Sequence, residues 1–173
     1  MRVVYSAAGF AVLAFAAHAQ QPASGDDYLA RVAKAAPPQI VEQATIVKMN
    51  GHEAEVVRKG TNQWTCMEAN GVPMCADPNA MEWAHAWQTH GAAPTSTGFI
   101  YMLAGDTGAS NTDPYAKGRT ADNHWVETGS HVMVVGAAAK DMKGYAREAD
   151  ADPTKPYVMW PGSPYEHLMI PVK

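Results

Sequence analysis

The spacing of apolar and polar residues in the first part of the chain predicts a helix followed by antiparallel strands. Residues 26–36 place apolar side chains at helical intervals and end at a Pro-Pro pair. Two strand-like runs, 44–49 and 53–59, flank Asn50 and Gly51. Because Asn-Gly favours the tight turn of a two-residue hairpin, we expect these runs to pair with each other.

The middle of the chain combines a well-signalled helix, a strand and a long polar loop. Asp77 followed by Pro78 predicts a helix start, since Asp suits the N-cap and Pro the first turn. This helix should end near His90, and residues 97–104 should form a strand. Residues 105–123 are rich in Gly, Asp and Asn, and ordered loops of that length are often functional.

The C-terminal part is expected to complete an α+β fold. Residues 132–135 indicate a strand and residues 138–146 a short helix. The runs 157–160 and 166–172 flank a Pro-Gly-Ser-Pro turn and predict a terminal hairpin. The order of elements therefore predicts a mainly antiparallel sheet with two or three short helices.

The N-terminal segment is typical of a secretory signal peptide. Arg2 precedes an apolar run, and Ala17, His18 and Ala19 form a small-residue cleavage site. We expect residues 1–19 to be removed, which leaves residues 20–173 as a single globular domain in the periplasm or outside the cell. The sequence leaves the choice between these two locations open, and also the oligomeric state.

Charge and hydropathy exclude two classes of partner. The chain carries 13 Lys and Arg against 17 Asp and Glu, a formal net charge of −4. A mildly acidic chain without a basic cluster lacks the positive surface that nucleic-acid binding requires. After the signal peptide, no apolar run approaches the roughly 20 residues of a spanning helix, so we expect no membrane insertion.

The two cysteines are predicted to pair. Cys66 and Cys75 lie close in sequence, and thiols tend to be oxidised in an exported protein. The disulfide would close a loop containing residues 70–73 and stabilise the fold by about 2 to 3 kcal/mol. A metal or redox role is not favoured, because the spacing is not Cys-x-x-Cys.

Two similar strands suggest a metal site. Strand alternation sends His131 and Met133 to one face of the first strand, and His167 and Met169 to one face of the second, while branched residues face the core. If the strands are neighbours, two imidazoles and two thioethers would come within reach of one soft ion, and thioethers favour copper(I). In the alternative interpretation a helix covers this face, methionines fill gaps and the histidines are hydrogen-bonded core residues.

The 105–123 loop offers two further hypotheses. Asp106, Asn111 and Asp113 are oxygen ligands that suit calcium, although Asp and Asn are also ordinary turn residues. A small hydrolase could instead use Ser110 as nucleophile with Asp113 and a histidine, His124 being the nearest in sequence. The residues around Ser110 lack the second glycine of a nucleophile elbow.

Three segments, 60–66, 109–115 and 156–160, resemble a group of small secreted bacterial proteins of unknown function. This resemblance implies a bacterial, exported, single-domain protein and assigns no functional residue. Together with the patterns above, it leads to an exported binding domain for a small ligand or metal ion, with copper as the sharpest version. The alternatives are the hydrolase and a structural or protein-interaction module.

Overall fold

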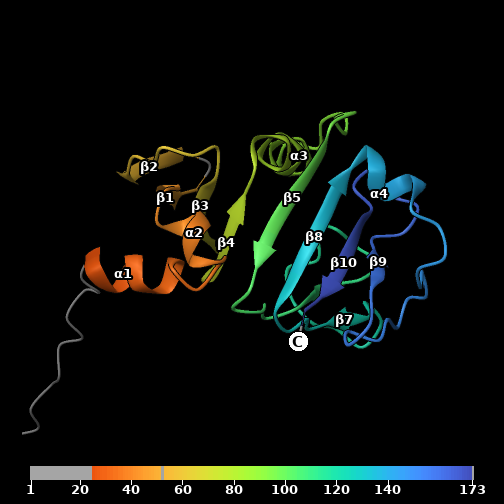
Figure 1. Ribbon diagram of the computed structural model, residues 1–173. Helices are drawn as coiled ribbons and strands as arrows, with labels where there is room; N and C mark the ends of the chain where they lie inside the picture. The colour runs from red at the N-terminus through yellow and green to blue at the C-terminus, as the bar shows by residue number, and fades with distance from the viewer. Residues whose placement is uncertain (1–24, 52, 173) are drawn as a thin grey trace, which may run out of the picture.

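The computed structural model describes residues 25–172 except residue 52 (Figure 1). The predicted signal peptide lies outside these residues. The described chain forms an eight-stranded mixed sheet in the order β2-β1-β3-β4-β5-β8-β10-β9, a two-stranded ribbon β6-β7 and four helices. All neighbouring pairs in the large sheet are antiparallel except β1 with β3. The predicted α+β class with a mainly antiparallel sheet is therefore confirmed.

The elements have the following bounds. The helices are α1 (Gly25–Val32), α2 (Pro38–Val41), α3 (Pro78–Gln88) and α4 (Ala137–Asp141). The strands of the large sheet are β1 (Thr45–Asn50), β2 (Glu53–Arg58), β3 (Thr65–Ala69), β4 (Val72–Ala76), β5 (Thr97–Met102), β8 (His131–Gly136), β9 (Tyr157–Met159) and β10 (His167–Pro171). The ribbon consists of β6 (Ala109–Ser110) and β7 (Trp125–Val126).

The N-terminal part follows the predicted pattern with two differences. The predicted β1-β2 hairpin is present, but Asn50 still belongs to β1 and pairs with Glu53, so the turn begins at Gly51, which takes a positive φ of 65°. The first helix ends at Val32, earlier than expected, and Pro38 begins the separate helix α2, where a residue without an N–H group is tolerated. The parallel pairing of β1 with β3 has no local sequence signal.

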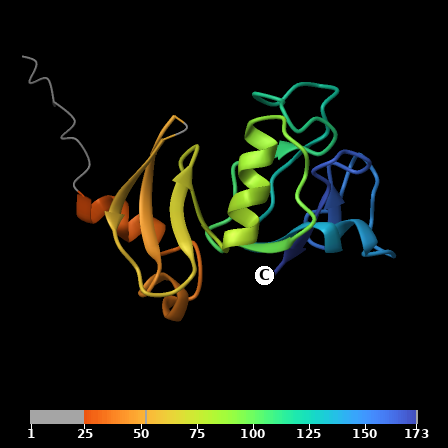
Figure 2. The same ribbon diagram turned by 90° about the horizontal axis from the view of Figure 1, so that it is seen from above.

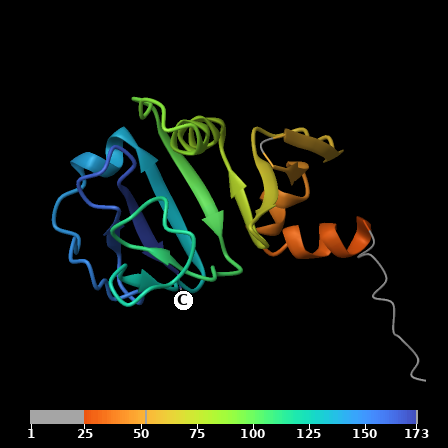
Figure 3. The same cartoon turned by 180° about the vertical axis from the view of Figure 1, so that it is seen from behind.

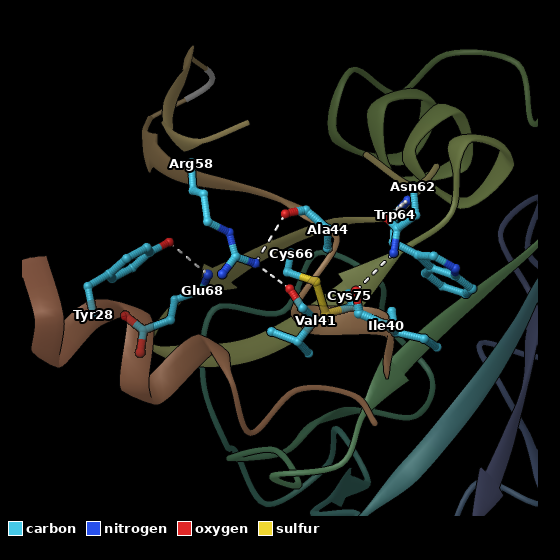
Figure 4. The surroundings of a disulfide bond; sticks show 10 residues. All are labelled: Tyr28, Ile40, Val41, Ala44, Arg58, Asn62, Trp64, Cys66, Glu68 and Cys75. Carbon is cyan, nitrogen blue, oxygen red and sulfur yellow. Dashed lines mark hydrogen bonds between the residues drawn. A yellow bond between two sulfur atoms is a disulfide. The ribbon is translucent and has the colours of Figure 1, made fainter. Parts of the chain in front are cut away.

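The predicted disulfide joins Cys66 of β3 to Cys75 of β4, which lie opposite each other in the hairpin (Figure 4). The connecting turn is shorter than expected, because β4 already begins at Val72. The disulfide belongs to a core cluster with α1, α2 and β1. Next to it, Arg58 donates to the backbone carbonyls of residues 41 and 44, which ties β2 to the end of α2 (Figure 4).

Helix α3 and the 105–123 loop lie on the same face of the sheet (Figures 2 and 3). Asp77 caps the helix as predicted: its Oδ1 accepts from the Ala80 amide at 2.8 Å, and its Oδ2 accepts from the Phe99 amide of β5 at 3.1 Å. Gly98 of β5 permits close contact, since a Cβ there would lie 2.2 Å from the Ala80 nitrogen. The start of α3 is thus fixed directly on β5.

The opposite face of the C-terminal strands carries a smaller core. Val134, Val158 and Leu168 pack there, with Met142 just after α4 beside them. Helix α4 ends at Asp141 and is shorter than the predicted helix over residues 138–146. No helix in the described part of the chain is both long and apolar enough to cross a membrane.

Candidate functional site

The two His-x-Met strands are neighbours in the sheet. β8 and β10 pair antiparallel, with Met133 directly opposite Met169. A local two-fold axis through this antiparallel pair relates one His-x-Met step to the other. The methionines therefore lie at the centre, and His131 and His167 lie at opposite ends. Each histidine is two residues, roughly 7 Å, along its strand from the centre. The adjacency that the copper hypothesis required is therefore present.

This face of β8 and β10 is covered by α3, which packs on β5 and β8, and by the ring of Trp160, which contacts His167. The Trp83 ring packs edge-on against the His167 ring, with 5.2 Å between centroids. Met133, Met169, His131 and His167 are all buried. The expectation that the branched residues face a core also holds, since Val134 and Leu168 are buried on the other side. Both faces of these strands are thus enclosed, as the alternative core interpretation anticipated.

A partly open cavity of about 920 Å³ runs along this side of the sheet, from the β1-β2 hairpin to β10. Eight of the ten methionines in the chain line it, and we call it the methionine cavity. These residues are Met49, Met67, Met74, Met81, Met102, Met133, Met159 and Met169. The lining also includes His131, His167 and Trp83. Both His-x-Met steps therefore border the same cavity.

The two histidines present unpartnered nitrogen atoms inside the protein. His131 Nδ1 lies 2.6 Å from the Gly129 carbonyl oxygen, and His167 Nδ1 lies 3.0 Å from the Tyr165 carbonyl oxygen. Because a carbonyl only accepts, Nδ1 carries the proton in each ring and Nε2 keeps a lone pair. Neither Nε2 atom has a hydrogen-bond partner among the described residues, although both are buried. The same is true of the Trp83 indole N–H.

Burial keeps both imidazoles neutral. It lowers the pKa of His131 against the opposing effects of the Gly129 carbonyl and the Asp106 charge. It lowers the pKa of His167 to about 4. At neutral pH both rings therefore offer a lone pair, and a neutral imidazole is the form that binds a metal ion.

Asp106 is an acidic residue in the lining of the methionine cavity, close enough to His131 for the two groups to interact electrostatically. Its Oδ1 accepts from the amides of Gly108 and Thr128, at 3.0 and 2.8 Å. Burial raises the pKa of Asp106, and the nearby His131 acts in the opposite direction. The calcium hypothesis used Asp106 as one of three ligands in the 105–123 loop. In the structure, Asp106 lies in the lining of the methionine cavity.

The other two residues of the calcium hypothesis have separate hydrogen-bond partners. Asn111 is buried, and its side-chain nitrogen donates to the carbonyls of residues 148 and 149, while its Oδ1 has no hydrogen-bond partner among the described residues. Asp113 is exposed and accepts from the Tyr115 amide within its own turn. In the described part of the chain, no three His, Cys, Asp or Glu side chains gather as a metal-binding group.

Ser110 is occupied by backbone hydrogen bonds. Its Oγ donates to the Asn123 carbonyl at 2.6 Å and accepts from the amides of Thr112 and Asp113. His124 Nδ1 lies 2.8 Å from an Asp150 carboxylate oxygen. No histidine of residues 25–51 or 53–172 is hydrogen-bonded to the Ser110 hydroxyl. This arrangement does not favour a nucleophilic serine.

Comparisons of the chain with models of protein families, with curated proteins and with solved structures give no match. The candidate site thus rests on its own geometry. The two histidines and two of the methionines of this site were predicted from the sequence. The other six methionines and the contact of Trp83 with His167 were not predicted, because they depend on which strands and helices meet.

Proposed function

We propose that this protein binds a copper(I) ion in the methionine cavity, through His131, His167 and the thioethers of Met133 and Met169. The observation that carries the proposal is the pair of buried imidazoles whose Nδ1 atoms bond to backbone carbonyls while Nε2 is left without a partner. Metal-binding histidines commonly have this arrangement, because the outer hydrogen bond fixes the tautomer and the ring orientation.

The donor set selects the metal. Thioethers are soft, uncharged ligands and favour copper(I), while a hard cation such as calcium requires several oxygen ligands. An ion above the paired Met133 and Met169 lies between the two histidines. The Nε2 atoms of His131 and His167 would complete its coordination, at the metal–nitrogen distance of about 2 Å that imidazole ligands give.

The test is an anaerobic titration of metal-free protein with copper(I) in competition with a chromogenic copper(I) chelator. The double variant Met133→Leu, Met169→Leu keeps the side-chain volume and removes both sulfur atoms. The matched control is Met67→Leu, Met74→Leu, which alters the other directly paired methionines of the same cavity. We expect the first variant to lose about tenfold or more in affinity, or about 1.4 kcal/mol, and the control to bind like the wild type. Equal affinity of the two double variants would refute the proposal.

The size of the cavity favours a second candidate, an iron porphyrin. The volume of about 920 Å³, taken over the whole partly open length of the cavity, is far larger than one ion needs and lies in the range of cofactor pockets. Histidine and methionine are both axial ligands of haem iron. Titration of metal-free protein with hemin distinguishes the candidates: a sharpened, shifted Soret band that is lost in His167→Ala supports haem, and an unchanged hemin spectrum excludes it.

We also infer that the protein acts in an oxidising compartment outside the cytoplasm. The inference rests on the predicted signal peptide over residues 1–19 and is supported by the Cys66–Cys75 disulfide, a bond that is rare in cytosolic proteins. Fractionation of cells followed by N-terminal sequencing tests it, with Gln20 as the expected first residue. An uncleaved protein in the cytoplasm would contradict it.

A further inference from the structure

A continuous series of aromatic rings connects the candidate copper site with the protein surface. The ring of His167 lies edge-on to Trp160, with 4.8 Å between centroids. Trp160 is 5.3 Å from Trp87, and Trp87 is stacked on Tyr115 at 6.5 Å. Tyr115 is 40% exposed and is stacked at 4.0 Å on the exposed His90 ring. We call His167, Trp160, Trp87 and Tyr115 the aromatic series.

The series is built from four separate parts of the chain and is held in place by hydrogen bonds. The indole of Trp160 donates to the Ser110 carbonyl at 2.8 Å, and that of Trp87 donates to the Pro114 carbonyl at 3.3 Å. The Tyr115 hydroxyl donates to the Trp87 carbonyl at 3.2 Å. The 105–123 loop thereby positions each of the three oxidisable rings.

Trp160 adopts an unfavourable backbone conformation at the inner end of the series. Its φ is +56°, in the left-handed region that bulky residues rarely occupy. Strain of this kind persists only where the surroundings enforce it, and it gathers at functional positions. Here the conformation accompanies an indole placed between His167 and Trp87.

We propose that the aromatic series carries single electrons between a copper ion bound at His167 and the surface at Tyr115. The inference rests on the proposed copper function. Indole and phenol rings are among the side chains most readily oxidised by one electron, and ring contacts of this length allow an electron to move in short steps. A surface route of this kind fits an ion that is enclosed beneath α3.

The reaction is a one-electron oxidation of copper(I) by an external outer-sphere oxidant. The oxidant takes one electron from the Tyr115 phenol, whose proton passes to solvent. An electron from copper(I) then moves through Trp160 and Trp87 to the phenoxyl radical, which regains a proton. The products are copper(II), the reduced oxidant and unchanged tyrosine, so electrons and protons balance.

The experiment uses copper(I)-loaded protein and a photogenerated ruthenium(III) polypyridyl complex as oxidant. Transient absorption follows the tyrosyl radical, and electron paramagnetic resonance measures the copper(II) formed. The variant Trp87→Phe keeps an aromatic ring that is much harder to oxidise, and the ring contacts of Trp87 in the described residues are with Trp83, Tyr115 and Trp160. The matched control is Trp64→Phe, because Trp64 packs on Tyr101 in the core cluster that contains the disulfide.

We expect Trp87→Phe to slow copper(II) formation by roughly tenfold or more, since each tenfold in rate corresponds to about 1.4 kcal/mol of barrier. Tyr115→Phe should remove the tyrosyl signal, and Trp64→Phe should behave like the wild type. The chelator titration, made first on every variant, separates the two proposals. Normal copper affinity with a wild-type rate in Trp87→Phe overturns the aromatic series alone, whereas absence of copper binding overturns both.

Discussion

Mild acid should destabilise this protein through His167. The buried ring has a pKa of about 4 in the folded protein, against about 6.5 for an exposed histidine in the unfolded chain. Between these values the unfolded chain binds a proton that the folded protein does not. The free energy of unfolding therefore falls as the pH decreases from about 6.5 toward 4. From pH 7 to pH 5 the loss from His167 alone is about 2 kcal/mol, and below pH 4 it reaches about 3 kcal/mol.

The assay is urea unfolding of the metal-free protein at pH 7 and pH 5, compared with His167→Asn. The asparagine amide can donate to the Tyr165 carbonyl in place of Nδ1–H, but it does not titrate. The loss of stability between the two pH values should be about 2 kcal/mol smaller in the variant. His131, whose pKa is also lowered by burial, contributes in the same direction in both proteins.

An equal pH dependence in the two proteins would show that His167 is not held neutral, and the reasoning would fail. The same outcome would weaken the copper proposal, because a protonated imidazole has no lone pair to offer. A packing defect in the variant would lower its stability equally at both pH values and would not change the difference between the two slopes. The difference between the two slopes, rather than either stability, is thus the decisive quantity.

Two further predictions concern the scaffold. Asp77→Ala should reduce stability by about 1 to 2 kcal/mol in urea unfolding, because it removes the N-cap of α3; Asp77→Asn, which keeps an acceptor, should lose less, and equal losses would argue against the cap. Reduction with dithiothreitol should reduce stability by about 2 to 3 kcal/mol. A double variant, Cys66→Ala with Cys75→Ala, should not respond to the reductant, and a response would assign its effect elsewhere.

The sequence predicted those features whose cause is local. The Asn50-Gly51 hairpin, the Asp77 cap and the disulfide each depend on a few neighbouring residues with one dominant preference. The same holds for the terminal hairpin of β9 and β10, whose connecting segment contains Pro161 and Gly162. The predicted ends of the helices were less accurate than the predicted turns. α1 and α4 are shorter than the apolar pattern suggested, since their ends depend on packing against the sheet.

The order of the strands in the sheet could not be predicted from local sequence signals. Nothing near β1 indicates a parallel pairing with β3, and nothing near β5 indicates that it lies between β4 and β8. The copper hypothesis assumed that the His131 and His167 strands are neighbours, and the β8-β10 register supplies that contact. Their enclosure by a helix was the competing interpretation of the same two strands. It changes the candidate site from an open face into a cavity.

The composition of this cavity argues for a soft ligand. A core that needs only apolar volume is served by leucine and isoleucine, which pack in better defined conformations than methionine does. Here eight of ten methionines gather around one cavity, together with two imidazoles that burial keeps neutral. A hard cation would gain little from these donors, because calcium prefers charged oxygen ligands. Sulfur and neutral nitrogen are the donors that copper(I) prefers, so between the two metals that the sequence suggested, the buried chemistry favours copper.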